Sequence, residues 1–280
     1  MKTKALTLLL AMAAITWSCS NAQNQNDNTA ATTTEAGAPD EADGRIAAGE
    51  TTDDPEYCAD EIEDCECGEG EDFVPVQFTG DKPTILDFAR AYLSIEGMGE
   101  GYGYLRSALE RYDKGKNPEY GELIVDKANG YISNTIDWSK VDGDRSEVSI
   151  NEMCYWNCKD GRHKIFASNV KGMSEGKYYE TEVTGVNFLC YDSKTKTMEW
   201  YSADQLGALV TAPDLCWPAQ DIENNNLSGE DWMRYAPVYT LPRTGKTIKV
   251  EVADPTIPTS KRRSCELTWN GEGFTKKFSK

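Results

Sequence analysis

The sequence predicts an α+β fold for residues 73–280, with two N-terminal helices followed by a mainly antiparallel β-sheet. Three observations lead to this class. Apolar residues recur at helical spacing early in the region, whereas later segments are rich in β-branched and aromatic residues and are separated by turn dipeptides. Regular alternation of strands and helices, which a doubly wound parallel sheet requires, is missing from the sequence. A lipocalin-like barrel and a cone-shaped sheet wrapped around the helices stay open as alternatives.

Two helices are expected from Thr84 onward. Thr84 is a typical N-cap residue, and apolar side chains follow it at the spacing of one helix face. A glycine-rich stretch, residues 97–103, separates this helix from a second one with the same spacing. The apolar positions are Ile85, Phe88, Ala89 and Tyr92 in the first helix, and Tyr104, Leu105, Ala108, Leu109 and Tyr112 in the second.

Asparagine-glycine dipeptides predict antiparallel hairpins in the rest of the domain. Asn129-Gly130 separates two apolar runs and favours a two-residue type I′ turn, in which both residues adopt positive φ. Asn270-Gly271 predicts another hairpin near the C-terminus. Further strands are expected at residues 183–191, 197–201, 247–252 and 265–278.

A third hairpin is predicted around Asp160-Gly161, pairing residues 153–157 with residues 163–167. Successive side chains of a strand point to opposite faces, so every second residue shares a face. With a two-residue turn, Cys154, Trp156 and Cys158 lie on one face, opposite His163, Ile165 and Ala167. We expect that face to point into the core.

The N-terminus predicts export from the cytoplasm. Lys2 and Lys4 precede an apolar run, residues 5–15, which has the length of a cleavable signal sequence and is too short to span a bilayer as a helix. Residues 15–20, Ile-Thr-Trp-Ser-Cys-Ser, resemble a bacterial lipobox, and together with the polar stretch behind them they resemble lipoproteins of the Bacteroidota, of an uncharacterised family.

The resemblance implies that residues 1–18 are a signal peptide and that Cys19 is the lipidated N-terminus of the mature chain. The partner implied is the membrane, reached through the lipid anchor. The location implied is the cell envelope, at the outer membrane, facing the periplasm or the surface. Cleavage before Gln23 by signal peptidase I is the alternative, and it predicts a soluble secreted or periplasmic protein.

The cysteines other than Cys19 are even in number, which in an exported chain predicts disulfide bonds. The disulfide candidates are Cys58, Cys65, Cys67, Cys154, Cys158, Cys190, Cys216 and Cys265. Three of them precede Phe73 and five follow it, so complete pairing requires at least one bridge between the two parts. Free thiols and a metal site at the first three cysteines are the alternatives, although their spacing matches no zinc motif.

Residues 19–72 are predicted to be an acidic, disordered tether. Seventeen acidic residues and one basic residue lie between Ser20 and Asp72, and large apolar side chains are almost absent. The formal net charge of the whole chain is −18, so most of the negative charge belongs to this segment. Nucleic acid is therefore an unexpected partner. Calcium binding is the alternative interpretation, but no stretch completes a calcium-loop pattern.

The sequence offers little catalytic chemistry, and we expect no catalytic residue, cofactor or metal. His163 is the single histidine of the chain, and no GxSxG motif accompanies it. A glycosidase needs two carboxyl groups about 5–9.5 Å apart. The acids that could supply such a pair are Glu147, Glu152, Asp160, Glu180, Glu182 and Asp192.

The tryptophans favour binding over catalysis. Trp217 and Trp232 lie in polar or proline-containing stretches, where exposed rings could stack on a ligand. The leading hypothesis is therefore a non-enzymatic lipoprotein that binds a glycan, a peptide or an envelope protein. The competing hypothesis is a secreted, glycosidase-like hydrolase that uses paired carboxylates.

Overall fold

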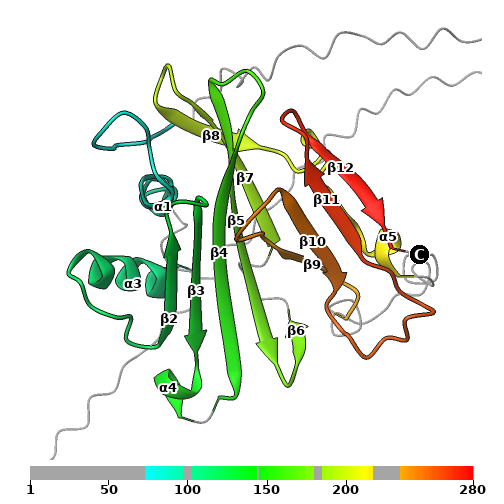
Figure 1. The fold of residues 1–280 in the computed structure, drawn as a ribbon. Helices are drawn as coiled ribbons and strands as arrows, with labels where there is room; N and C mark the ends of the chain where they lie inside the picture. Colours follow the sequence, from blue (N-terminus) through cyan, green and yellow to red (C-terminus); the bar gives the residue numbers. More distant parts are fainter. Residues whose placement is uncertain (1–72, 97–101, 144, 180–184, 217–233, 280) are drawn as a thin grey trace, which may run out of the picture. The chain divides into compact units, whose positions relative to one another are not determined.

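The protein is mainly antiparallel β-sheet, and the prediction of an α+β fold is wrong. The structure, a computed structural model, describes residues 73–96, 102–143, 145–179, 185–216 and 234–279, all of which belong to one compact unit (Figure 1). Strands account for 42% of the described residues and helices for 16%.

Most of the strands form an eight-stranded sheet. Its order is β1-β8-β7-β5-β4-β3-β2, with β6 paired to β5, and every pairing is antiparallel. Among the described strands, β1 and β2 end this order and do not pair with each other, so these strands form an open sheet and not the barrel considered as an alternative. The strands are β1 (Val74–Pro75), β2 (Gly121–Asp126), β3 (Tyr131–Asp137), β4 (Glu147–Asn157), β5 (His163–Ser174), β6 (Lys177–Tyr179), β7 (Gly185–Asp192) and β8 (Thr197–Tyr201).

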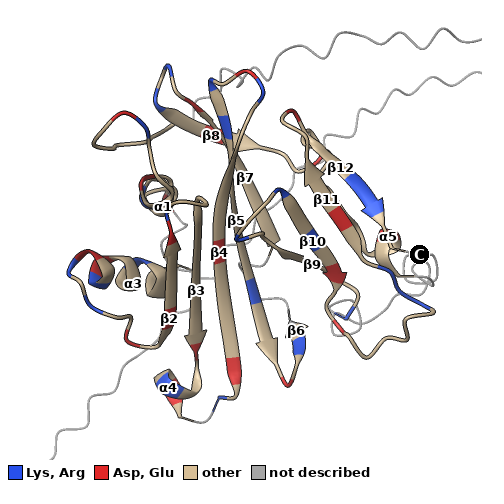
Figure 2. Ribbon diagram, viewed as in Figure 1, with Lys and Arg blue, Asp and Glu red and all other residues tan. Residues whose placement is uncertain are grey.

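A second, four-stranded sheet has the order β12-β11-β10-β9. Strands β10 and β11 alternate between buried and exposed residues, and the charged residues of β10, β11 and β12 are exposed. Figure 2 marks the positions of these charged residues along the strands. One face of this sheet is therefore in the core and the other is in water. The strands are β9 (Pro237–Thr240), β10 (Thr247–Val252), β11 (Cys265–Trp269) and β12 (Phe274–Phe278).

Two helices longer than one turn are described, and they occupy the stretches with helical spacing. Helix α1 (Ile85–Leu93) starts with a capping box, in which the Asp87 carboxylate accepts from both the backbone and the hydroxyl of Thr84 at 2.7 Å. Helix α3 (Gly103–Asp113) follows, and α4 (Ser139–Asp142) and α5 (Ala212–Leu215) are single turns. Within the described residues, no helix combines the length and apolarity needed to cross a bilayer.

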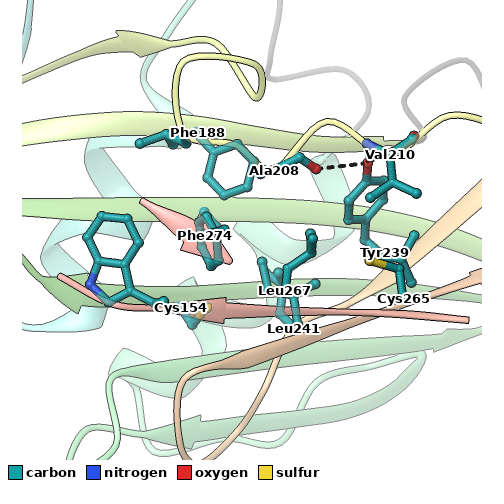
Figure 3. Close-up of a cluster of buried hydrophobic side chains, with 14 of the residues drawn as sticks. Cys154, Phe188, Ala208, Val210, Tyr239, Leu241, Cys265, Leu267 and Phe274 are labelled. Atoms are coloured by element: carbon teal, nitrogen blue, oxygen red, sulfur yellow. Dashed lines mark hydrogen bonds between the residues drawn. The ribbon is translucent and has the colours of Figure 1, made fainter. Parts of the chain in front are cut away.

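The large sheet is covered on both faces, which explains why the fold class was predicted wrongly. Helices α1 and α3 pack on one face, burying residues such as Ile132, Met153 and Phe166. The four-stranded sheet packs on the other face, and residues such as Trp156 and Phe188 share a cluster with Trp269 and Phe274 of the small sheet (Figure 3). Because the second cover is a sheet and not further helices, β-structure predominates.

The hairpin joining β4 and β5 has the predicted register. Cys154 pairs with Ala167 and Trp156 with Ile165, and their shared face is buried against the small sheet. The Cys158 N–H donates to the His163 carbonyl at 3.0 Å, which continues the same register.

The hairpin joining β2 and β3 differs from the prediction. Asp126 pairs with Tyr131, so the connection contains four residues, 127–130, and not the expected two. The Asp126 carboxylate accepts from the backbone and side chain of Asn129, at 3.2 and 3.0 Å, and Gly130 has a φ of 64°. The side-chain hydrogen bonds of Asp126 therefore stabilise a wider turn than the dipeptide alone indicated.

Candidate functional site

The two tryptophans predicted to stack on a ligand, Trp217 and Trp232, lie outside the described residues. The predicted lipidation site Cys19 and the tether cysteines Cys58, Cys65 and Cys67 also lie outside them. The site is therefore built from residues that the structure does place.

The five described cysteines are all buried: Cys154, Cys158, Cys190, Cys216 and Cys265. Burial, followed by the charge of Glu152, raises the pKa of Cys154 well above its ordinary value, and burial also raises the pKa of Cys216 and Cys265. Raised pKa values disfavour the nucleophilic thiolate. No disulfide forms among the described residues, and the predicted bridges to the tether stay a prediction.

His163 is held between two carboxylates at the turn end of β5. Its Nδ1 is hydrogen-bonded to the Asp160 carboxylate, and its Nε2 lies 4.0 Å from Asp192 Oδ1. The guanidinium of Arg162 forms a bidentate pair with Asp192, with Nε 2.7 Å from Oδ1, and this pair lowers the pKa of Asp192 to about 2. Because His163 is 94% buried, these contacts join two turns and leave the imidazole little access to a substrate.

Glu152 of β4 and Lys171 of β5 form a buried ion pair on the face of the large sheet that the small sheet covers. The Lys171 Nζ lies 3.0 Å from Glu152 Oε2, and each side chain is at most 7% exposed. Glu152 also accepts from the Tyr131 hydroxyl, the Asn169 amide and the Leu241 N–H, at 3.1–3.2 Å. The carboxylate is fully engaged by protein donors, which makes it a structural group and a poor general acid.

An aromatic hollow lies where α1 ends beside β8. It has a volume of about 440 Å³, and the residues lining it are Phe73, Val74, Pro75, Ser94, Ile95, Glu96 and Trp200. Phe73 and Trp200 are 46% and 38% exposed, which makes them two of the most exposed large apolar side chains in the described structure. We call this feature the Phe73–Trp200 hollow.

The Trp200 ring is in contact with the buried ring of Tyr92. The Tyr92 ring packs against it edge-on, with centroids 6.2 Å apart and an angle of 66° between the planes. The hydroxyl of Tyr92 is held in turn by the Asn187 amide, at 3.0 Å. A fixed indole with an exposed surface is the usual platform for stacking on a sugar ring or docking an apolar side chain.

A second hollow of about 490 Å³ adjoins the first, and the two share Ser94. It lies between α1 and α3, and charged side chains line much of it: Arg90, Arg106, Glu110 and Asp113. Arg90 and Asp113 form an ion pair across it, with Nη2 2.7 Å from Oδ1. An aromatic surface therefore continues into one that offers hydrogen-bond donors and acceptors.

Sequence reasoning missed Trp200 as a candidate. Period-two alternation places it on the same face as Met198, and Met198 is buried beneath the helices. The ring of Trp200 lies beside the residues that follow α1, Ser94 to Glu96, and it is 38% exposed there. The signal was the presence of an aromatic residue at a strand end, but its exposure depends on the helix packed over it.

No family model, curated protein or solved structure matches the chain. In the part of the chain that the structure places, no three His, Cys, Asp or Glu side chains are grouped to hold a metal ion.

Proposed function

We propose that this chain is an exported, lipid-anchored, non-enzymatic binding protein that recognises a glycan of the cell envelope or its surroundings. The signal-like N-terminus and Cys19 support the export and anchoring. The observation that supports binding is the Phe73–Trp200 hollow, where two exposed rings adjoin a surface rich in hydrogen-bonding groups.

The combination of the two hollows favours a glycan over an apolar peptide. A sugar ring presents an apolar face to an indole and a rim of hydroxyl groups to polar side chains. Trp200 can supply the first contact, and the guanidinium and carboxylate groups of the second hollow can supply the others. An apolar peptide would make no use of these polar groups and would bury some of them against an apolar surface.

The lining of the Phe73–Trp200 hollow argues against the hydrolase alternative. Glycoside hydrolysis uses two carboxyl groups on either side of the scissile bond. Among the described residues that line this hollow, Glu96 alone carries a carboxyl group, and the acids of the adjoining hollow are Glu110 and Asp113, of which Asp113 is paired with Arg90. The lining fits binding better than bond cleavage.

Fluorine NMR of the mature protein labelled with 5-fluorotryptophan tests the binding proposal. The Trp200 resonance, identified from its loss in Trp200→Ala, should shift when neutral oligosaccharides are titrated, and the resonance of buried Trp156 should not. Tyr112→Ala is the matched control, because Tyr112 is also 38% exposed but does not line either hollow. Binding that survives Trp200→Ala, or a shift with an apolar peptide and with no sugar, would contradict the proposal.

Intact mass of the mature protein tests the anchor separately. We expect a mass equal to residues 19–280 plus acyl chains. An unacylated chain starting at Gln23 would refute lipidation at Cys19 and leave the binding proposal standing. The same measurement with and without a reductant and an alkylating agent counts any disulfides that involve the tether.

A further inference from the structure

A basic patch lies at the β12 edge of the small sheet. Residues 234–279 contain nine Lys and Arg side chains and four Asp and Glu side chains, a net charge of +5 in a chain whose total is −18. Five of the nine lie along β12 and in the segment that precedes β11 (Figure 2). We call these five residues the β12 patch: Lys261, Arg262, Arg263, Lys276 and Lys277.

The two stretches that supply the patch are held side by side. The Ser279 N–H donates to the Ser264 carbonyl at 2.9 Å, so residues 261–263 lie beside the end of β12. The Arg263 guanidinium packs on the ring of Phe278, 4.1 Å from its centroid, and keeps its positive charge there. The two stretches therefore present their cations on one edge of the sheet.

The cations of the β12 patch have few acidic partners. The Lys277 Nζ lies 3.9 Å from Glu266 Oε2, and the two side chains are 81% and 50% exposed, so this ion pair is weak. No acidic side chain of the described structure lies within 4.0 Å of Lys261 or Lys276. Arg262 donates to two backbone carbonyls, which leave its charge unbalanced. Most of the positive charge is therefore available to an anionic partner.

The chain itself carries an acidic segment that joins the domain at Phe73. Residues 59–72 contain eight Asp and Glu side chains and no Lys or Arg. Strand β1 begins one residue after Phe73 and pairs with β8, which pairs with β7. The ring of Phe188 in β7 lies 5.7 Å from the ring of Phe274, the first residue of β12. Strand β12 therefore packs over β7, two strands from the one that the acidic segment enters.

The acidic segment is long enough to reach the patch. Fourteen residues, 59–72, span at most about 46 Å when extended. Neighbouring strands are about 4.8 Å apart and packed sheets are about 10 Å apart, so the path from β1 to β12 is shorter than the segment. A group joined to the domain by a short segment has an effective concentration on the order of millimolar. Charge complementarity and chain length together favour this segment over a separate anionic partner.

We propose that residues 59–72 bind the β12 patch of the same molecule through ion pairs. Lysines on an edge strand discourage pairing with other strands, but an acidic segment is attracted by the same charges. The bound segment covers the patch, so another anion reaches it only by displacing the segment. This contact does not depend on the proposed glycan-binding function.

Carbodiimide crosslinking of the mature protein, followed by peptide mass spectrometry, tests the contact, because the reagent joins carboxylates to lysine amines that touch them. At about 0.01 M salt, where the Debye length is about 30 Å, residues 59–72 should be linked to Lys261, Lys276 and Lys277. At about 1 M salt the Debye length is about 3 Å, and the yield should fall about fivefold or more. A mixture of isotope-labelled and unlabelled protein distinguishes links within one molecule from links between two.

Charge reversal tests the patch as a unit. Lys276→Glu combined with Lys277→Glu should reduce the links to Lys261 about fivefold, because the variant repels the acidic segment. Lys114→Glu combined with Lys116→Glu is the matched control, since both lysines are exposed and follow α3, and it should leave the Lys261 links unchanged. The absence of links to the patch, equally abundant links to Lys114 and Lys116, links that persist at high salt, or links only between molecules would overturn the proposal. Phosphatidylglycerol vesicles that bind the patch while such links are absent would also overturn it, because the patch would then serve an anionic membrane.

Discussion

Replacing Glu152 or Lys171 with methionine should destabilise the protein to different extents. In Glu152→Met, the Lys171 ammonium stays buried with the Thr240 hydroxyl at 2.9 Å and the Tyr178 ring at 5.9 Å as its remaining polar contacts. Three further donors, on Tyr131, Asn169 and Leu241, lose the carboxylate as well. In Lys171→Met, by contrast, the carboxylate keeps those three donors.

The expected loss of unfolding free energy follows from these contacts. Removing one partner of a buried ion pair costs about 3–5 kcal/mol. We expect Glu152→Met at the upper end of that range and Lys171→Met at the lower end or below it. The double variant should be more stable than Glu152→Met, because it no longer buries an uncompensated charge. Removing one partner of an exposed ion pair should lower the free energy of unfolding by only about 0–1 kcal/mol. Lys159→Met, at the exposed Lys159–Glu272 pair, is therefore the matched control.

Equilibrium unfolding in urea, followed by far-UV circular dichroism and tryptophan fluorescence, measures these free energies. Coincident transitions and unchanged m-values are needed for the comparison. If Lys171→Met costs more than Glu152→Met, or if the double variant shows the sum of the two single effects, the assignment of Glu152 as the centre of a buried, charge-compensated network is wrong.

Two further predictions concern acid stability and a glycine. The pKa of Asp192 is about 2 when folded, against an ordinary value of 3.8, so its contribution to stability is present above about pH 4 and is lost as the pH falls toward 2. Arg162→Met should therefore lower the urea midpoint at pH 7 and converge with wild type near pH 2; a constant difference across this range would contradict the pair. Gly130→Ala should destabilise the protein by more than Gly176→Ala. Both glycines have positive φ, but a Cβ at Gly130 would lie 2.7 Å from the Tyr155 ring, whereas the space at Gly176 is open. Equal urea midpoints for the two variants would show that the ring moves aside without cost.

Local sequence determined the elements whose partners are near in the chain. The β4–β5 register agrees with the prediction, because period-two alternation around Asp160-Gly161 aligns the two strands, although pairing ends at Asn157–Lys164 and the connection is wider than the two-residue turn that was expected. Helix α1 could be placed because Thr84 caps it and its apolar residues share one face. The wider β2–β3 turn was missed because the side chain of Asp126 participates in it.

The candidate site could not be predicted from local sequence. Trp200 shares a strand face with buried Met198, and nothing local in the sequence distinguishes the exposed ring from the buried side chain. The burial of Glu152 likewise depends on β9, whose neighbouring Leu241 donates to it from 89 residues away in the chain.

The sequence by itself determined where helices and hairpins form, because turn geometry and side-chain periodicity act over a few residues. Only the tertiary structure decided that a second sheet covers the first. This packing also determines which polar and aromatic side chains are buried and which are exposed. The physical reason is that burial is a property of surfaces in contact, and the strands of the two sheets come from distant parts of the chain.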